Sequence, residues 1–161
     1  MRALTPVEAA IVVAVAGSVL AVSLPEFLRN LHASRLVEPI DGLKHIAARA
    51  SALAASRPTA QAYPPTVELT PEKVPRGERV VDPPGTWDAP TWRALAFEQR
   101  VAHGFSFGFE SQNSPHLASF RAYAHGDLDG DGILSTFEVS GQSVEGQSPV
   151  VFALEMYREV E

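Results

Sequence analysis

The chain has 161 residues, of which 45% are hydrophobic and 20% charged, a composition typical of a folded protein that excludes a disordered one. It contains no cysteine, so disulfides, thiolate zinc sites, iron–sulfur clusters and thiol nucleophiles are excluded. With a formal net charge of −6, the chain lacks the basic surface that phosphate binding needs. We therefore expect no nucleic-acid partner.

An apolar segment lies near the N-terminus. Residues 7–25 hold fourteen Ala, Val, Ile or Leu among nineteen positions, and Glu8 is their only charged residue. Counted from Leu4 to Pro25, the segment has roughly 20 residues, the short end of what crosses ~30 Å of hydrocarbon as a helix. It is therefore predicted to be a membrane helix or the h-region of a signal peptide.

The apolar pattern continues as an amphipathic helix through residues 26–56. Apolar side chains recur there every three to four positions, with Arg, His and Lys between them. Pro25, Pro39 and Gly42 interrupt the pattern. Two interpretations follow: one helix of about fifty residues that bends at these positions, or a membrane helix that ends at Pro25 and is followed by a separate surface helix.

A proline-rich stretch follows at residues 57–90, with eight prolines in 34 positions. This density predicts an extended loop without a regular helix, whose scattered Val, Tyr and Trp side chains pack along a core. A short helix is predicted next, with Asp88 as its N-cap and Pro90 in its first turn.

Within residues 101–161, apolar side chains alternate as strands do at Phe105, Phe107 and Phe109 and again at Phe120, Ala122 and Ala124. Two antiparallel strands are predicted around Phe105–Phe109 and Phe120–Ala124, with further strands at 137–140 and 149–157. We therefore predict an α+β fold, in which a long N-terminal helix with a hydrophobic first half packs through residues 26–55 on a small antiparallel sheet of three or four strands. Residues 57–161 would form this globular head.

An acidic loop within the head satisfies the calcium-loop pattern D-x-[DN]-x-[DN]-G-x5-E in full. Its alternating hard oxygen ligands suit Ca²⁺, and a glycine permits the sharp turn. The predicted ligands are Asp127, Asp129, Asp131, Ile133 through its carbonyl, Ser135 through water, and Glu138 with two oxygens. The alternative is an Asp-Gly turn that binds nothing, with Glu138 facing solvent.

The N-terminal sequence M-R-A-L-T-P-V-E-A-A-I-V-V-A joins a short basic leader to the apolar run, with Glu8 inside it. Pro25 closes the run and an amphipathic extension follows. This arrangement resembles the leader and first helix of type IV pilins and pseudopilins. The resemblance extends to the run G-D-L-D-G-D-G-I-L-S-T-F at 126–137, which is similar to one in pilin-like heads.

The resemblance implies a pilin-like fold with a leader at residues 1–3 and a transmembrane and polymerisation half of the helix at 4–25. Prepilin peptidase would cleave between Ala3 and Leu4, and Leu4 would become the N-methylated terminus. Glu8 would pair with the terminal ammonium of a neighbouring subunit, because two buried charges select a register when they dock together. The partners implied are copies of this chain or other pilins and an inner-membrane assembly platform. The protein would lie in the inner membrane and then in a periplasmic pseudopilus or an extracellular pilus.

The alternative for the N-terminus is a secretory signal peptide, with Arg2 as its basic region and Ala21-Val22-Ser23 as its cleavage tripeptide. It would leave a mature N-terminus at Leu24, and the protein would be a secreted or singly anchored calcium-binding module that does not polymerise. Both alternatives are non-enzymatic. The five histidines show no metal-ligand pairing and are expected at the surface or in interfaces, and no nucleophile or phosphate-loop motif occurs.

Overall fold

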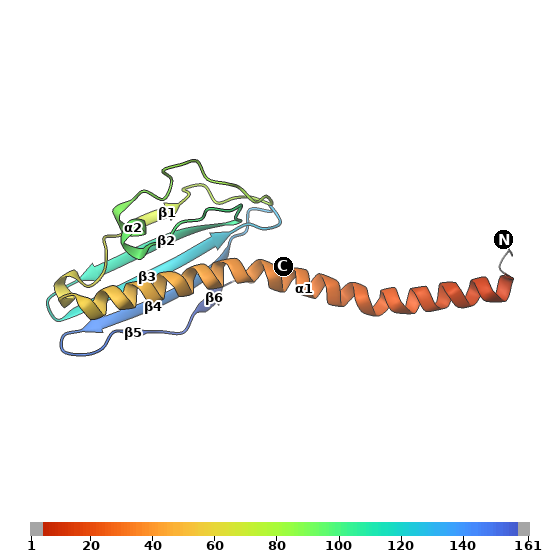
Figure 1. Cartoon of the computed structure of the whole chain (residues 1–161), viewed down its shortest axis with the longest axis horizontal. Helices are drawn as coiled ribbons and strands as arrows, with labels where there is room; N and C mark the ends of the chain where they lie inside the picture. The colour runs from red at the N-terminus through yellow and green to blue at the C-terminus, as the bar shows by residue number, and fades with distance from the viewer. Residues whose placement is uncertain (1–4, 158–161) are drawn as a thin grey trace. The chain divides into compact units, whose positions relative to one another are not determined.

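The computed structural model describes residues 5–157, without the side chains of residues 28–35. The chain divides into two compact units, Met1–Val37 and Glu38–Glu161. Helix α1, Pro6–Ser56, runs through both units as one helix of 51 residues (Figure 1). It is not interrupted at Pro25, Pro39 or Gly42, so the continuous helix is the correct one of the two interpretations. A proline removes a single backbone hydrogen bond, and the turns on either side remain helical.

Within the first unit, the apolar part of α1 spans Pro6–Phe27 with a mean hydropathy of 2.3, and none of it is buried. Its 22 residues are long and apolar enough to cross a membrane. The hydroxyls of Ser18 and Ser23 donate to the carbonyls of Ala14 and Val19, at 2.8 and 2.7 Å. These two polar groups are therefore satisfied inside the helix, as a hydrocarbon environment requires.

The second unit holds an antiparallel sheet of six strands with the order β1-β2-β3-β4-β5, and β6 also pairs with β4. The strands are β1 Val67–Thr70, β2 Phe105–Asn113, β3 Leu117–Gly126, β4 Ser135–Val144, β5 Val150–Val151 and β6 Glu155–Tyr157. The prediction of three or four strands was too low. One further strand, β1, lies inside the proline-rich stretch, and the last segment pairs with β4 in two short pieces.

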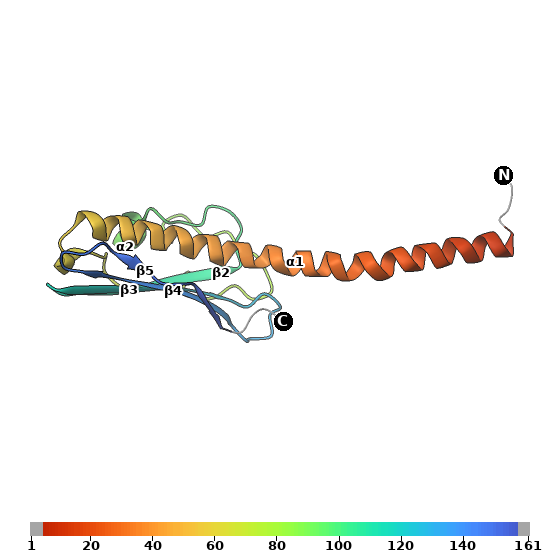
Figure 2. The same cartoon turned by 90° about the horizontal axis from the view of Figure 1, so that it is seen from below.

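The core lies between the sheet and the part of α1 that belongs to this unit (Figure 2). Alternate residues of β3 and β4 are buried, including Ala122 and Phe137, and the first five residues of β2 are all buried, including Phe107. Leu43, Ile46, Ala47, Ala50 and Ala54 of α1 are buried as well. The prediction that residues 26–55 pack on the sheet is thus confirmed from Glu38 onward, whereas residues 26–37 belong to the other unit.

At Gly42 the backbone of α1 lies close to the sheet. A β-carbon at Gly42 would lie 2.6 Å from Cε1 of Phe107, which is closer than real side chains approach. Gly42 therefore does not end the helix. It lets the helix backbone lie directly against the Phe107 ring.

The proline-rich stretch is more regular than predicted, because it contains the 3₁₀ turn η1, Thr59–Gln61, as well as β1. The short helix α2, Pro90–Leu95, begins with Pro90 at its first position, and its Trp92 and Leu95 are buried. Its N-cap is Ala89 and not the predicted Asp88, whose carboxylate instead lies 3.4 Å from the Arg93 guanidinium.

Candidate metal site and membrane segment

Three aspartates of the acidic loop come together after β3. Asp127 is buried, Asp129 and Asp131 are exposed, and one carboxylate oxygen of each lies within 4.8 Å of the others. Such a group could hold a metal ion by its hard oxygen atoms. The first half of the predicted ligand set is therefore assembled in space.

Backbone amides fold the loop around these carboxylates. The N–H groups of Gly130 and Gly132 donate to the two oxygens of Asp127, at 2.8 and 3.1 Å. Those of Asp131 and Ile133 donate to the carboxylates of Asp129 and Asp131. Gly130 and Gly132 have φ angles of +81° and +90°, a region that side chains disfavour, so glycine is required at both turns.

Of the remaining predicted ligands, Glu138 does not lie with the aspartates. Ser135 is buried at the start of β4, paired with Gly126, and Ile133 is exposed in the loop. Glu138 lies on β4, beyond Ser135, where a strand rises ~3.3 Å per residue and carries it away from the loop. In an EF-hand, the helix that follows the loop brings the last ligand back toward the first ones. The strand that follows the loop here does not bring Glu138 back to the aspartates.

Glu138 instead belongs to an ion network on the sheet face opposite the core. Its carboxylate lies 3.2 Å from Arg121, which also donates two hydrogen bonds to Glu110 on β2. The hydrogen bond with Glu110 is the main cause that raises the pKa of Arg121, and Glu138 adds to it. The predicted role of Glu138 as a bidentate ligand finds no support in this geometry.

A cation lies on the other side of the acidic loop. The Arg76 Nε is 3.9 Å from Oδ2 of Asp127, and the Gly77 N–H donates to the Asp127 carbonyl at 2.7 Å. The proline-rich stretch thus crosses the loop and fixes its first aspartate. No local sequence pattern connects positions so far apart, so this contact could not be predicted.

The first turn of α1 contains a capping box. The Thr5 N–H and hydroxyl both donate to one Glu8 oxygen, at 2.7 and 2.8 Å, and the Glu8 N–H donates to the Thr5 hydroxyl. Pro6 occupies the first helical position, where its missing N–H costs nothing. The sequence Thr-Pro-Val-Glu carries this signal, which the sequence analysis missed. Ala3 and Leu4, the predicted processing site, lie outside the described residues.

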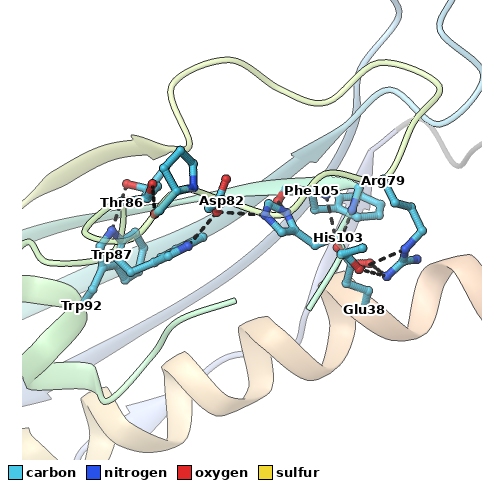
Figure 3. Close-up of polar contacts among 12 residues, drawn as sticks. Glu38, Arg79, Asp82, Thr86, Trp87, Trp92, His103 and Phe105 are labelled. Carbon is cyan, nitrogen blue, oxygen red and sulfur yellow. Dashed lines mark hydrogen bonds and ion pairs between the residues drawn. The ribbon is translucent and has the colours of Figure 1, made fainter. Parts of the chain in front are cut away.

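A polar cluster joins α1, the proline-rich stretch and the start of β2 (Figure 3). Glu38 of α1 accepts the N–H groups of Gly104 and Phe105 and forms an ion pair with Arg79 at 2.8 Å. His103 is fully buried beside Asp82, at 2.9 Å. The expectation that every histidine lies at the surface or in an interface is therefore wrong for His103, which is part of the core of the head.

Comparisons with protein-family models, with curated proteins and with solved structures found no match to this chain. What the structure itself provides is an α+β head, one helix that could anchor in a membrane or serve as a signal sequence, and three aspartates that could bind a metal ion.

Proposed function

We propose that this protein is a membrane-anchored structural subunit of a type IV pilus or a type II secretion-like pseudopilus, with a pilin-like fold. One observation carries the proposal: a single helix has an unburied apolar first part, Pro6–Phe27, and a later part buried in the core of an antiparallel sheet. A helix of 22 residues is about 33 Å long and matches ~30 Å of hydrocarbon.

The apolar part needs an environment that removes it from water. Every large apolar side chain described between Val7 and Phe27 is more than half exposed. Burial contributes about 25 cal/mol per Å², so this surface requires lipid before assembly and apolar helices of other subunits after it. One surface thus serves both the inner-membrane stage and the filament stage, whether the filament is a periplasmic pseudopilus or an extracellular pilus.

Glu8 is the group that would set the register between subunits. Its carboxylate is satisfied by Thr5 within the same chain, which lowers the cost of a charge near the membrane. Pairing with the terminal ammonium of a neighbouring Leu4 would replace hydrogen bonds with an ion pair. Assembly of this kind exchanges one set of partners for another and never leaves the carboxylate alone.

Replacing Glu8 tests the assembly role. We expect Glu8→Gln to insert into the membrane like the wild type and to enter filaments at least tenfold less, because the neighbouring ammonium loses its partner. Quantitative immunoblotting of membrane and sheared-filament fractions would measure this. Glu26→Gln on the same helix is the matched control. Equal incorporation of Glu8→Gln and wild type would contradict the proposed pairing.

The head would carry Ca²⁺ as a structural ion. Three carboxylates within 4.8 Å repel one another, and a divalent ion would relieve that repulsion. With Glu138 elsewhere, backbone carbonyls and water would complete the coordination, and we expect an affinity of about 10⁻⁴–10⁻³ M, the range of extracellular modules. The ion would hold the loop at the end of β3 in one conformation.

A second function, a secreted or singly anchored calcium-binding module, is supported by the same aspartates and by the location of the apolar helix, where a signal sequence would also lie. The mass of the mature N-terminus separates the two. Processing by prepilin peptidase yields N-methyl-Leu4, whereas signal peptidase yields Leu24. A terminus at Leu24 would overturn the pilin proposal and leave calcium binding untouched.

A further inference from the structure

Both ring nitrogens of the buried His103 face hydrogen-bond acceptors (Figure 3). Nδ1 lies 2.8 Å from the carbonyl oxygen of Phe105, and Nε2 lies 2.9 Å from Oδ2 of Asp82. The same Oδ2 accepts the indole N–H of Trp87 at 2.7 Å. The His103 side chain is 0% exposed and that of Asp82 is 6% exposed, so water does not share these contacts.

The number of protons on the His103 ring follows from the two acceptors that its nitrogens face. A neutral imidazole has one donor and one acceptor nitrogen, whereas this geometry needs two donors. The alternative places the extra proton on Asp82, but an aspartate carboxyl is ordinarily a stronger acid than an imidazolium, and Oδ2 already accepts from Trp87. We propose that His103 is held as a doubly protonated imidazolium. Its proton-dependent ion pair with Asp82, the clasp, would hold the segment 79–87 against the residues just before β2.

The neighbouring charges agree with a charged ring. Glu38 reaches the cluster from α1, and Arg79 and Asp82 reach it from the proline-rich stretch. These three side chains carry two negative charges and one positive charge. A cationic His103 completes the balance, whereas a neutral ring leaves the cluster with an uncompensated negative charge in a buried place.

Loss of the ring proton would open the clasp. A neutral His103 could donate to only one of its two acceptors, the Phe105 carbonyl or the Asp82 carboxylate, and in either case Asp82 would lose the opposite charge beside it. The adjacent backbone pair, in which Val80 and His103 exchange two hydrogen bonds at 2.9 Å, would lose its support. Apart from Phe105 at the start of β2, the ladders between β2, β3 and β4 contain none of these groups and would persist.

Nitrogen NMR of the ¹⁵N-labelled full chain in detergent micelles tests the proposal directly, with the pH raised from about 6 to about 10. At the lower pH both His103 ring nitrogens are expected to carry protons. Loss of one proton should coincide with a shift of the Trp87 indole signal and with faster exchange of the Val80 amide, while the Ala122 amide on β3 stays unchanged. A neutral ring at about pH 6, or a Trp87 signal that does not follow His103, would overturn the clasp.

A matched variant tests the consequence for stability. Asp82→Asn keeps the shape of the side chain and removes its charge. The thermal midpoint of the wild type should fall by about 5 °C or more across the His103 titration, and that of Asp82→Asn should show no such step. The same step in both proteins would refute the clasp. Should the variant not fold, the NMR titration of the wild type still decides.

Discussion

The three clustered carboxylates of Asp127, Asp129 and Asp131 repel one another unless positive charge or hydrogen-bond donors compensate them. Backbone N–H groups and Arg76 provide part of this compensation. A divalent ion would provide the rest, so the loop is the place in the head where a ligand is expected to add stability.

We expect calcium to raise the thermal midpoint of the full chain in micelles. At ten times the dissociation constant the gain is about 1.4 kcal/mol, measurable by calorimetry in calcium and in chelator. Asp131→Asn should remove the gain. Glu138→Gln should keep it, because Glu138 contacts Arg121 and not the aspartates. Equal midpoints in calcium and chelator would contradict calcium binding, and loss of the gain in Glu138→Gln would restore the full sequence motif.

Tyr63 is buried at 3% exposure against Phe120, and its hydroxyl has no hydrogen-bond partner among the described residues. Burial raises its pKa from 10.0 to about 12. The folded state therefore holds the proton more tightly than the unfolded state. Stability from this group is complete below pH 10 and is lost as the pH rises from 10 toward 12.

Tyr63→Phe should consequently be neutral or stabilising by up to about 1 kcal/mol at pH 7, since it removes a buried hydroxyl without a partner. Between pH 10 and 12 its stability should fall less steeply than that of the wild type. Denaturant unfolding at both pH values measures the difference. A loss above about 2 kcal/mol at pH 7 would mean that the hydroxyl has a partner.

At the scale of elements, the contact between α1 and β2 depends on Gly42. Adding a methyl group there forces the Phe107 ring or the helix to move, and such overpacking costs about 1–3 kcal/mol. We expect Gly42→Ala to lower the free energy of unfolding by this amount, although alanine is the better helix former. Gly17→Ala is the control, because its β-carbon would meet nothing within 4 Å. A stabilised Gly42→Ala chain would show that the contact is loose.

The N-terminal end of α1 depends on the capping box. Thr5→Ala removes both side-chain hydrogen bonds of Thr5, and loss of such a cap costs about 1 kcal/mol. We expect faster amide exchange in the first turn, residues 7–9, measured by NMR in micelles. Ser18→Ala, which removes only a hydroxyl bonded to the Ala14 carbonyl, should leave that turn unchanged. Equal exchange in Thr5→Ala and wild type would show that the cap contributes nothing.

At the scale of the whole molecule, the local patterns predicted the elements they encode. The 3.6-residue period predicted α1, and the alternating phenylalanines predicted β2. What could not be predicted depends on pairing between distant positions. Val80 meets His103 and Arg76 meets Asp127, and neither partner carries a local signal of the other. The acidic motif predicted three ligands that lie together, but its last position, Glu138, falls on β4, the strand predicted from the alternating pattern, and contacts Arg121 instead.

The long sequence separation of these contacts also orders events during synthesis. The apolar residues 6–27 leave the ribosome first, while Phe107, whose ring lies against Gly42 of α1, belongs to a strand that begins at Phe105. Until β2, β3 and β4 have emerged, the apolar stripe of the second half of α1 has no sheet to cover it. The proposed membrane insertion would therefore precede folding of the head, and a chain stalled before β4 would expose two apolar surfaces where the finished protein exposes one.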